Sequence, residues 1–205
     1  MSGVSRAELR LLDGLAHPLA RPLIGIDGLP CAGKTTLAFR LAAEHGFEIM
    51  QVDEFLRPEA DWLSRRPGFP FPYLRYDEFL QAVTDLAETG ECTYAPFDWD
   101  ISAVSVKKRR ITTARPVIVE GISALVPLLE RYYGLKIFVK SDRGSILEVA
   151  RARSLGLWAR EWREIFLPSA DMYMLTHPEK RADLVVQGRG MKTENGQRSF
   201  ELAAS

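Results

Sequence analysis

The segment 22–36, PLIGIDGLPCAGKTT, constrains the fold of this 205-residue chain more than any other part of it. It contains the P-loop pattern GxxxxGKT, which runs from Gly28 to Thr35. The glycines of such a loop let successive backbone N–H groups point at phosphate oxygens; Lys34 reaches the β- and γ-phosphates, and the Thr35 hydroxyl can bind Mg²⁺. The residues expected to contact a nucleotide are Gly28, Ala32, Gly33, Lys34, Thr35 and Thr36.

The residues around the loop strengthen this interpretation. The apolar residues of 23–26 form a short strand candidate directly before it, and apolar residues recur at helical spacing after it until Gly46. A helix that begins at the loop adds the positive potential of its N-terminus to a phosphate site. Strand, loop and helix together predict a site for a nucleotide phosphate.

Further apolar runs alternate with helical patterns along the chain. Continuous runs of this kind are typical of parallel strands that are buried on both faces. A helix is expected with Asp77 as its N-cap and Gly90 at its end, and another is expected to open at Ser141. The pattern predicts an α/β P-loop NTPase fold with right-handed crossovers, in which helices flank a five-stranded parallel sheet. The other strand candidates are 47–52, 116–120, 135–140 and 183–187.

Three less regular segments complete this outline. Residues 5–16 are expected to form a short amphipathic helix, and the segments 93–97 and 104–113 a small polar β-hairpin. The tail after Gly188 is polar, and partial disorder is expected there. The whole chain, 1–205, is expected to form a single domain.

The composition of the chain disfavours several classes of protein. The chain has 27 basic and 27 acidic residues, so it lacks the global charge typical of proteins that bind nucleic acid. No apolar run has the length of a membrane span, and the N-terminus lacks a signal-peptide pattern. Two cysteines, Cys31 and Cys92, are too few for a disulfide framework, and we expect Cys31 only to fill its place in the loop. A cytoplasmic protein is expected.

Two carboxylates follow strand candidates at the edge of the sheet where ligands bind. Glu120 stands where a Walker B acid would bind Mg²⁺, and its alternative role is a capping or surface carboxylate. Asp53 is a candidate to orient an attacking hydroxyl and accept its proton, the alternative being a surface acid at a strand end. Its neighbour Glu54 is a second candidate for the base.

With these residues in place, the chain resembles the uridine kinase-like P-loop kinases, a group similar to phosphoribulokinase and bacterial pantothenate kinase. The resemblance extends from about residue 22 to 188, and its later segments are the more specific ones. The segments that carry it are IGIDG and GKTT within 24–36, VDEF at 52–55, APFDW at 95–99, VIVEGISAL at 117–125, LKIFV at 135–139 and HPEKRADLVV at 177–186.

The resemblance implies a small-molecule kinase that transfers a phosphoryl group from ATP to a hydroxyl, with Mg²⁺ as cofactor. It assigns Lys34 and Thr35 to the phosphates and the metal, Asp53 to the acceptor hydroxyl, and Glu120 to the metal. It also implies a helical lid at about 151–168 that carries an arginine. Arg160 is the first candidate for a catalytic lid arginine, and the alternatives are Arg153 and Arg163.

The acceptor pocket is expected within residues 56–102, which are rich in aromatic and charged side chains. The segment 71–77 replaces the Asn-Phe-Asp-His-Pro stretch of uridine kinases, and 97–102 lacks the histidine and arginine that the resemblance would require there, so uridine itself is disfavoured. An acceptor like a nucleoside, pantothenate or a sugar stays open, since Asp98 would suit a polyol and Arg75 an anion. The candidate substrate-binding residues are Tyr73, Arg75, Asp98 and Trp99, whose alternative role is packing or capping.

A second function class stays open, a regulatory P-loop ATPase that acts through a protein partner. A GTPase is disfavoured because the chain has no Asn-Lys-x-Asp motif; Asn195 is its only asparagine. The partners expected from the sequence are a small-molecule substrate and possible second copies of the chain in a homodimer, with no nucleic acid and no membrane.

Overall fold

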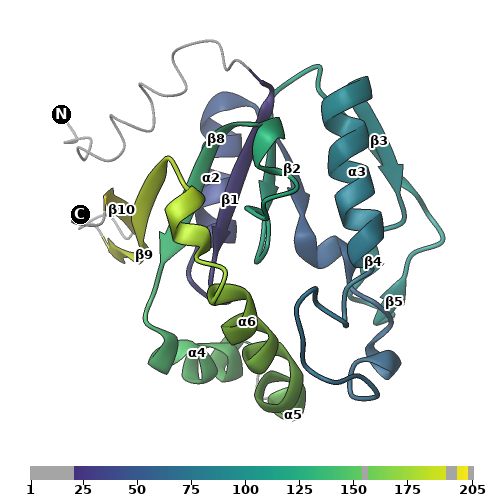
Figure 1. Ribbon diagram of the computed structural model, residues 1–205, viewed down its shortest axis with the longest axis vertical. Coiled ribbons are helices and arrows are strands. Elements are labelled where there is room, and N and C mark those ends of the chain that lie inside the picture. Colours follow the sequence, from purple (N-terminus) through teal and green to yellow (C-terminus); the bar gives the residue numbers. More distant parts are fainter. Residues whose placement is uncertain (1–20, 154–156, 193–197, 203–205) are drawn as a thin grey trace.

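The computed structural model describes residues 21–153, 157–192 and 198–202 (Figure 1). The helix expected over 5–16 lies outside these residues. The centre of the fold is a six-stranded sheet with the order β10-β9-β8-β1-β7-β2. Its strands are β1 (Leu23–Gly28), β2 (Glu48–Gln51), β7 (Val117–Glu120), β8 (Tyr133–Lys140), β9 (Leu184–Lys192) and β10 (Arg198–Leu202).

Five of these strands are parallel, which confirms the predicted fold class. The sixth strand, β10, pairs antiparallel with β9 and was not expected. The expectation of disorder after Gly188 is therefore wrong for the described part of the tail. Its polar sequence has no apolar run that would predict a strand, because β10 is the edge strand of the sheet.

One face of the sheet packs against helix α2 (Lys34–His45). Every residue of β1 and β7 is buried, and successive side chains of a strand point to opposite faces. Ile24, Ile26 and Ile118 share this face with Leu37 and Leu41 of α2. Each such burial contributes about 1.5–3 kcal/mol, so the helix that follows the P-loop is held firmly against the sheet.

The opposite face is covered by a larger core that includes α3 (Tyr76–Thr89) and α6 (Leu167–Met174). Leu23, Val117 and Val119 pack there with residues such as Phe79 of α3. Helix α3 ends at Gly90 as predicted, but its N-cap is Arg75 and not Asp77. Asp77 lies in the first turn, where a negative charge still stabilises the helix.

The predicted hairpin is divided into two small antiparallel pairs. Strand β3 (Glu91–Tyr94) pairs with β6 (Arg109–Thr112), and β4 (Phe97–Asp98) pairs with β5 (Ala103–Val104). The remaining helices include α4 (Ile146–Arg153), α5 (Ala159–Glu161) and the π-helical segment η5 (Trp162–Phe166), which leads into α6. The short 3₁₀ segments are η1 (Val52–Phe55), η2 (Glu59–Asp61), η3 (Glu130–Tyr132), η4 (Arg143–Ser145) and η6 (Pro178–Arg181).

The helical segment from α4 to α6 lies beyond the end of the sheet at which β8 stops (Figure 1). This is the end where the parallel strands have their carboxyl termini, and where the P-loop connects β1 to α2. Within the described residues, no helix combines the length and the apolar character needed to cross a membrane.

Candidate active site

The P-loop leaves β1 at a point of very close backbone contact. Gly28 has φ 145°, and a Cβ at this position would lie 2.2 Å from the Val139 carbonyl oxygen of β8. Only glycine fits such an approach. Lys34 opens α2 and is largely buried, and its Nζ donates a hydrogen bond of 2.9 Å to the Leu29 carbonyl oxygen. The ammonium group is thus held directly over the loop.

The metal-binding pair predicted from the sequence is brought together by α2 and β7. Thr35 Oγ1 donates to Glu120 Oε1 at 3.0 Å, and Gln51 Nε2 of β2 donates to the same oxygen at 2.8 Å. Burial raises the pKa of Glu120 above its ordinary value, while the charge of Lys34 and the Gln51 hydrogen bond act against this rise. A hydroxyl and a carboxylate oxygen at this distance are hard oxygen donors and fit Mg²⁺.

A cavity of about 320 Å³ opens from this point. Lys34, Thr35 and Glu120 line one part of it, and Asp53, in η1 directly after β2, lines the same space. The rest of its wall is mainly aromatic and comes from the loop after η1, from the β4–β5 turn and from the helical segment beyond the sheet. One cavity therefore lies against both the phosphate loop and this aromatic wall.

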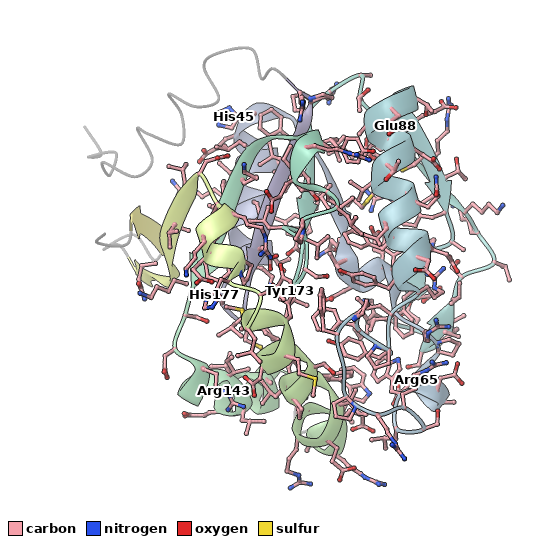
Figure 2. The ribbon with its side chains drawn as sticks, in the orientation of Figure 1. His45, Arg65, Glu88, Arg143, Tyr173 and His177 are labelled. Carbon is pink, nitrogen blue, oxygen red and sulfur yellow. The ribbon has the colours of Figure 1, made fainter. Side chains whose placement is uncertain are left out.

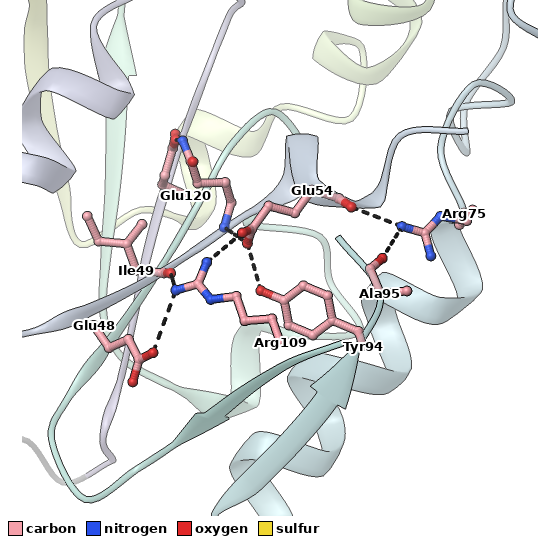
Figure 3. A network of polar contacts seen from close by, with 9 residues as sticks. Glu48, Ile49, Glu54, Arg75, Tyr94, Ala95, Arg109 and Glu120 are labelled. Atoms are coloured by element: carbon pink, nitrogen blue, oxygen red, sulfur yellow. Dashed lines mark hydrogen bonds and ion pairs between the residues drawn. The ribbon is translucent and has the colours of Figure 1, made fainter. Parts of the chain in front are cut away.

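The structure separates the two neighbouring acids that the sequence left as alternatives. Asp53 lines the cavity, whereas the Glu54 carboxylate binds the polar residues beside β6 (Figure 3). Its Oε1 accepts from Arg109 Nη1 at 2.5 Å, and its Oε2 accepts from the Tyr94 hydroxyl at 2.6 Å and from the Gln51 backbone N–H at 3.1 Å. Burial, together with the charge of Glu54, raises the pKa of Tyr94, so its hydroxyl remains protonated as a donor. Glu54 therefore holds the η1 turn in place.

Two of the four predicted substrate-binding residues, Tyr73 and Trp99, line the cavity. The structure places Arg75 and Asp98 outside its lining. The Arg75 guanidinium is buried and donates to the carbonyl oxygens of Glu54 at 2.9 Å and of Ala95 at 2.6 Å (Figure 3). Asp98 Oδ1 instead accepts the backbone N–H of Asp100 at 3.0 Å. The sequence left packing or capping open as their alternative role; the Asp98 hydrogen bond is of this kind, whereas the carbonyl partners of Arg75 were not predicted.

The predicted lid arginine does not reach the cavity in this structure. Arg160 is exposed, and its Nε pairs with Glu164 at 3.0 Å, one helical turn away. Arg163 is also exposed, and the side chains of Arg151 and Arg153 lie outside the described part of the molecule. The helical segment contributes aromatic side chains to the cavity instead.

Sequence reasoning missed a buried carboxylate directly before the first P-loop glycine. Asp27 has no exposed surface and accepts the backbone N–H groups of Gly28, Ser123 and Leu125 at 2.6, 3.1 and 2.8 Å. Its fourth donor is the hydroxyl of Tyr173, which lies at the centre of the molecule where α6 meets the sheet (Figure 2). Burial raises the pKa of Asp27. The sequence contained one indication that Asp27 binds other segments, because an acidic residue inside an otherwise apolar strand needs hydrogen-bond donors.

Fold and site together define a P-loop protein in which the phosphate loop, Asp53 and an aromatic wall line one cavity. No protein-family model matches the chain. No curated protein matches its sequence.

Solved structures resemble it in three dimensions. One is described as a "possible uridine kinase" from Bacillus stearothermophilus, with 20% identity and a TM-score of 0.66, over 87% of this chain and 95% of that one. A "putative fructose transport system kinase" from Silicibacter sp. TM1040 has 20% identity and a TM-score of 0.64, over 81% and 93%. The YGR205w protein has 9% identity and a TM-score of 0.52, over 99% and 100%. The chain therefore has the fold that the sequence resemblance implied.

Proposed function

We propose that this protein is an ATP-dependent phosphotransferase of the uridine kinase-like group, which transfers the γ-phosphoryl group to a hydroxyl of a small molecule. The observation that carries the proposal is the single cavity lined by Lys34, Thr35, Glu120 and Asp53. A protein that only hydrolyses ATP needs no aromatic wall beside its phosphate loop, whereas this cavity has one. The kinase names of the structurally similar proteins agree with this proposal.

Each residue of the cavity has a role in such a transfer. The P-loop backbone and Lys34 bind the phosphates of ATP and stabilise the charge that develops during transfer. When bound, Mg²⁺ would be held by Thr35 and Glu120 and would neutralise charge on the phosphate oxygens. Asp53 orients the acceptor hydroxyl and accepts its proton as the oxygen attacks the γ-phosphorus and ADP leaves.

The test is ADP formation from ATP and Mg²⁺ by the purified chain, with a panel of nucleosides, pantothenate, sugars, sugar phosphates and aromatic alcohols. We expect at least one hydroxyl compound to stimulate ADP formation and to appear as its phosphate ester. Lys34→Ala should reduce this rate by at least ~100-fold, because one preorganised charge at the transferred group is lost. Hydrolysis that no compound changes, but that a protein partner alters, would instead support the regulatory ATPase.

A further inference from the structure

All four tryptophans of the sequence lie in the wall of one cavity. Tyr73 and Phe166 complete this wall, and the six residues are called the aromatic chamber below. They come from three separate segments, so the tertiary structure and not a local motif gathers them. The members of the aromatic chamber are Trp62, Tyr73, Trp99, Trp158, Trp162 and Phe166.

The rings of the chamber support one another. Trp62 is 1% exposed and forms its base, with ring centroids 6.0 Å from Trp158 and 5.2 Å from Phe166. Tyr73, also buried, lies 4.8 Å from Phe166. Trp99 is 51% exposed at the rim, and its ring lies 5.7 Å from Trp158. The chamber is thus a wall of packed aromatic rings that is buried at Trp62 and Tyr73 and exposed at Trp99.

The backbone of Trp158 adds an independent sign of function. Trp158 has φ 56° and ψ 25°, a left-handed conformation that bulky residues rarely adopt. Such residues concentrate at binding sites, where surrounding contacts hold them in place. The contacts that hold Trp158 are made by Trp62 and Trp99, both members of the chamber.

The charges of the cavity lie at one end. Lys34, Asp53 and Glu120 are the only charged side chains among its described lining residues, and all three belong to the phosphate end. The indole N–H of Trp62 is already used, since it donates to the Arg57 carbonyl oxygen at 2.8 Å. The chamber therefore offers large flat apolar surfaces, and its other polar groups are the Tyr73 hydroxyl and the indole N–H groups of Trp99, Trp158 and Trp162.

We infer that the acceptor is an uncharged aromatic alcohol, whose ring lies in the aromatic chamber and whose hydroxyl lies at Asp53. This inference rests on the proposed phosphotransferase function and names its substrate class. Flat rings favour offset-stacked and edge-to-face contacts with aromatic walls. A carboxylate or phosphate on the acceptor would be buried in the chamber without a cationic partner among the residues described there, which strongly opposes binding.

The same reasoning disfavours sugars. Each additional hydroxyl that is buried without a hydrogen-bond partner lowers affinity by roughly 10- to 100-fold. Asp53 can serve the reacting hydroxyl, but the described walls of the chamber supply no carboxylate, carboxamide or guanidinium group for the other hydroxyls of a polyol.

The chamber provides its own reporter, because every tryptophan of the chain lines it. Intrinsic fluorescence is titrated with three probes: phenylethanol, its para-carboxylate and ribose. We expect a saturable response to phenylethanol at a concentration at least ~10-fold lower than for the other two. Equal or tighter binding of the carboxylate or of ribose would overturn the inference, as would a lack of saturable response to phenylethanol.

Substitutions in the β4–β5 turn test whether phenylethanol binds in the aromatic chamber. Trp99→Ala should weaken phenylethanol binding by about 3- to 10-fold, and Trp99→Phe should restore most of it. The control Ile101→Ala removes another exposed apolar side chain of the same turn that lies outside the cavity lining, and it should leave binding unchanged. An equal effect of both alanine substitutions would refute the assignment.

Nucleotide binding is measured separately with a fluorescent ATP analogue. Failure to bind that analogue contradicts the proposed phosphotransferase function. Intact ATP binding together with a preference for an anionic or polyol probe contradicts only the acceptor class.

Discussion

The neighbouring acids Asp53 and Glu54 should give opposite results when each is changed to its amide. Asp53 lines the cavity, whereas Glu54 binds Arg109, Tyr94 and the Gln51 backbone. We therefore expect Asp53→Asn to reduce phosphoryl transfer with little change in stability. Glu54→Gln should reduce stability while leaving most of the chemistry intact.

The loss of stability for Glu54→Gln follows from its contacts. The carboxylate is 16% exposed and accepts three hydrogen bonds, one of them from a guanidinium. An amide has one oxygen, so at least one of these donors then faces an N–H group. The remaining hydrogen bonds become weaker, because the acceptor no longer carries a negative charge. Hydrogen bonds to charged groups contribute ~1.5–3 kcal/mol, and we expect a loss of about 2–3 kcal/mol. For a chain of this size this lowers Tm by roughly 4–12 °C.

Asp53→Asn removes the proposed proton acceptor and keeps the size of the side chain. The side chain is exposed toward the cavity, so the free energy of unfolding should change by less than about 0.5 kcal/mol. Loss of a general base costs ~100-fold or more in the rate of transfer.

Both variants are compared with the unaltered protein by thermal unfolding and by ADP formation with the acceptor found in the panel. Both measurements are needed, because a fall in rate caused by unfolding would accompany a lower Tm. Transfer that is lost in Glu54→Gln at unchanged Tm, with Asp53→Asn active, would reverse the two assignments.

Two further changes probe the phosphate end. The Gln51 side chain donates a hydrogen bond that lowers the pKa of Glu120, so Gln51→Leu should raise that pKa. The Glu120 carboxylate then becomes protonated at a higher pH, and the acidic limb of the pH–rate profile should move to higher pH. In Gly188→Ala the new Cβ would lie 2.4 Å from the Ala32 carbonyl oxygen of the P-loop, so urea unfolding should show a loss of ~1–3 kcal/mol, with weaker ATP binding. Gly68→Ala, which has open space at this position, is the matched control; an equal loss there would contradict the reasoning.

The parts of the fold that the sequence predicted are those with a strong local pattern. β1 and β7 are buried throughout, β8 contains the buried apolar run 137–139, and α2 and α3 end at Gly46 and Gly90 as expected. The N-cap of α3 and the edge strand β10 were missed. In both places the local residues allow more than one conformation, and contacts with distant segments select among them.

The residues of the candidate site that could be predicted from the sequence are likewise those with a local pattern. The P-loop is contiguous in sequence, so its residues and their chemistry could be read directly from segment 22–36. Glu120 was predictable because it ends a buried strand at the edge where ligands bind. The contacts of Arg75 could not be predicted in this way, because its guanidinium donates to backbone carbonyls of segments far from it in the chain.

Periodicity and a contiguous glycine-rich loop are local properties, so the parallel α/β sheet and a candidate phosphate site could be predicted from the sequence alone. Only the tertiary structure separated Asp53 from Glu54, since the two adjacent side chains leave the η1 turn toward different surroundings. It alone also gathered four tryptophans from three distant segments around one cavity. The contacts that define that cavity form between residues far apart in the chain, and no local pattern records them.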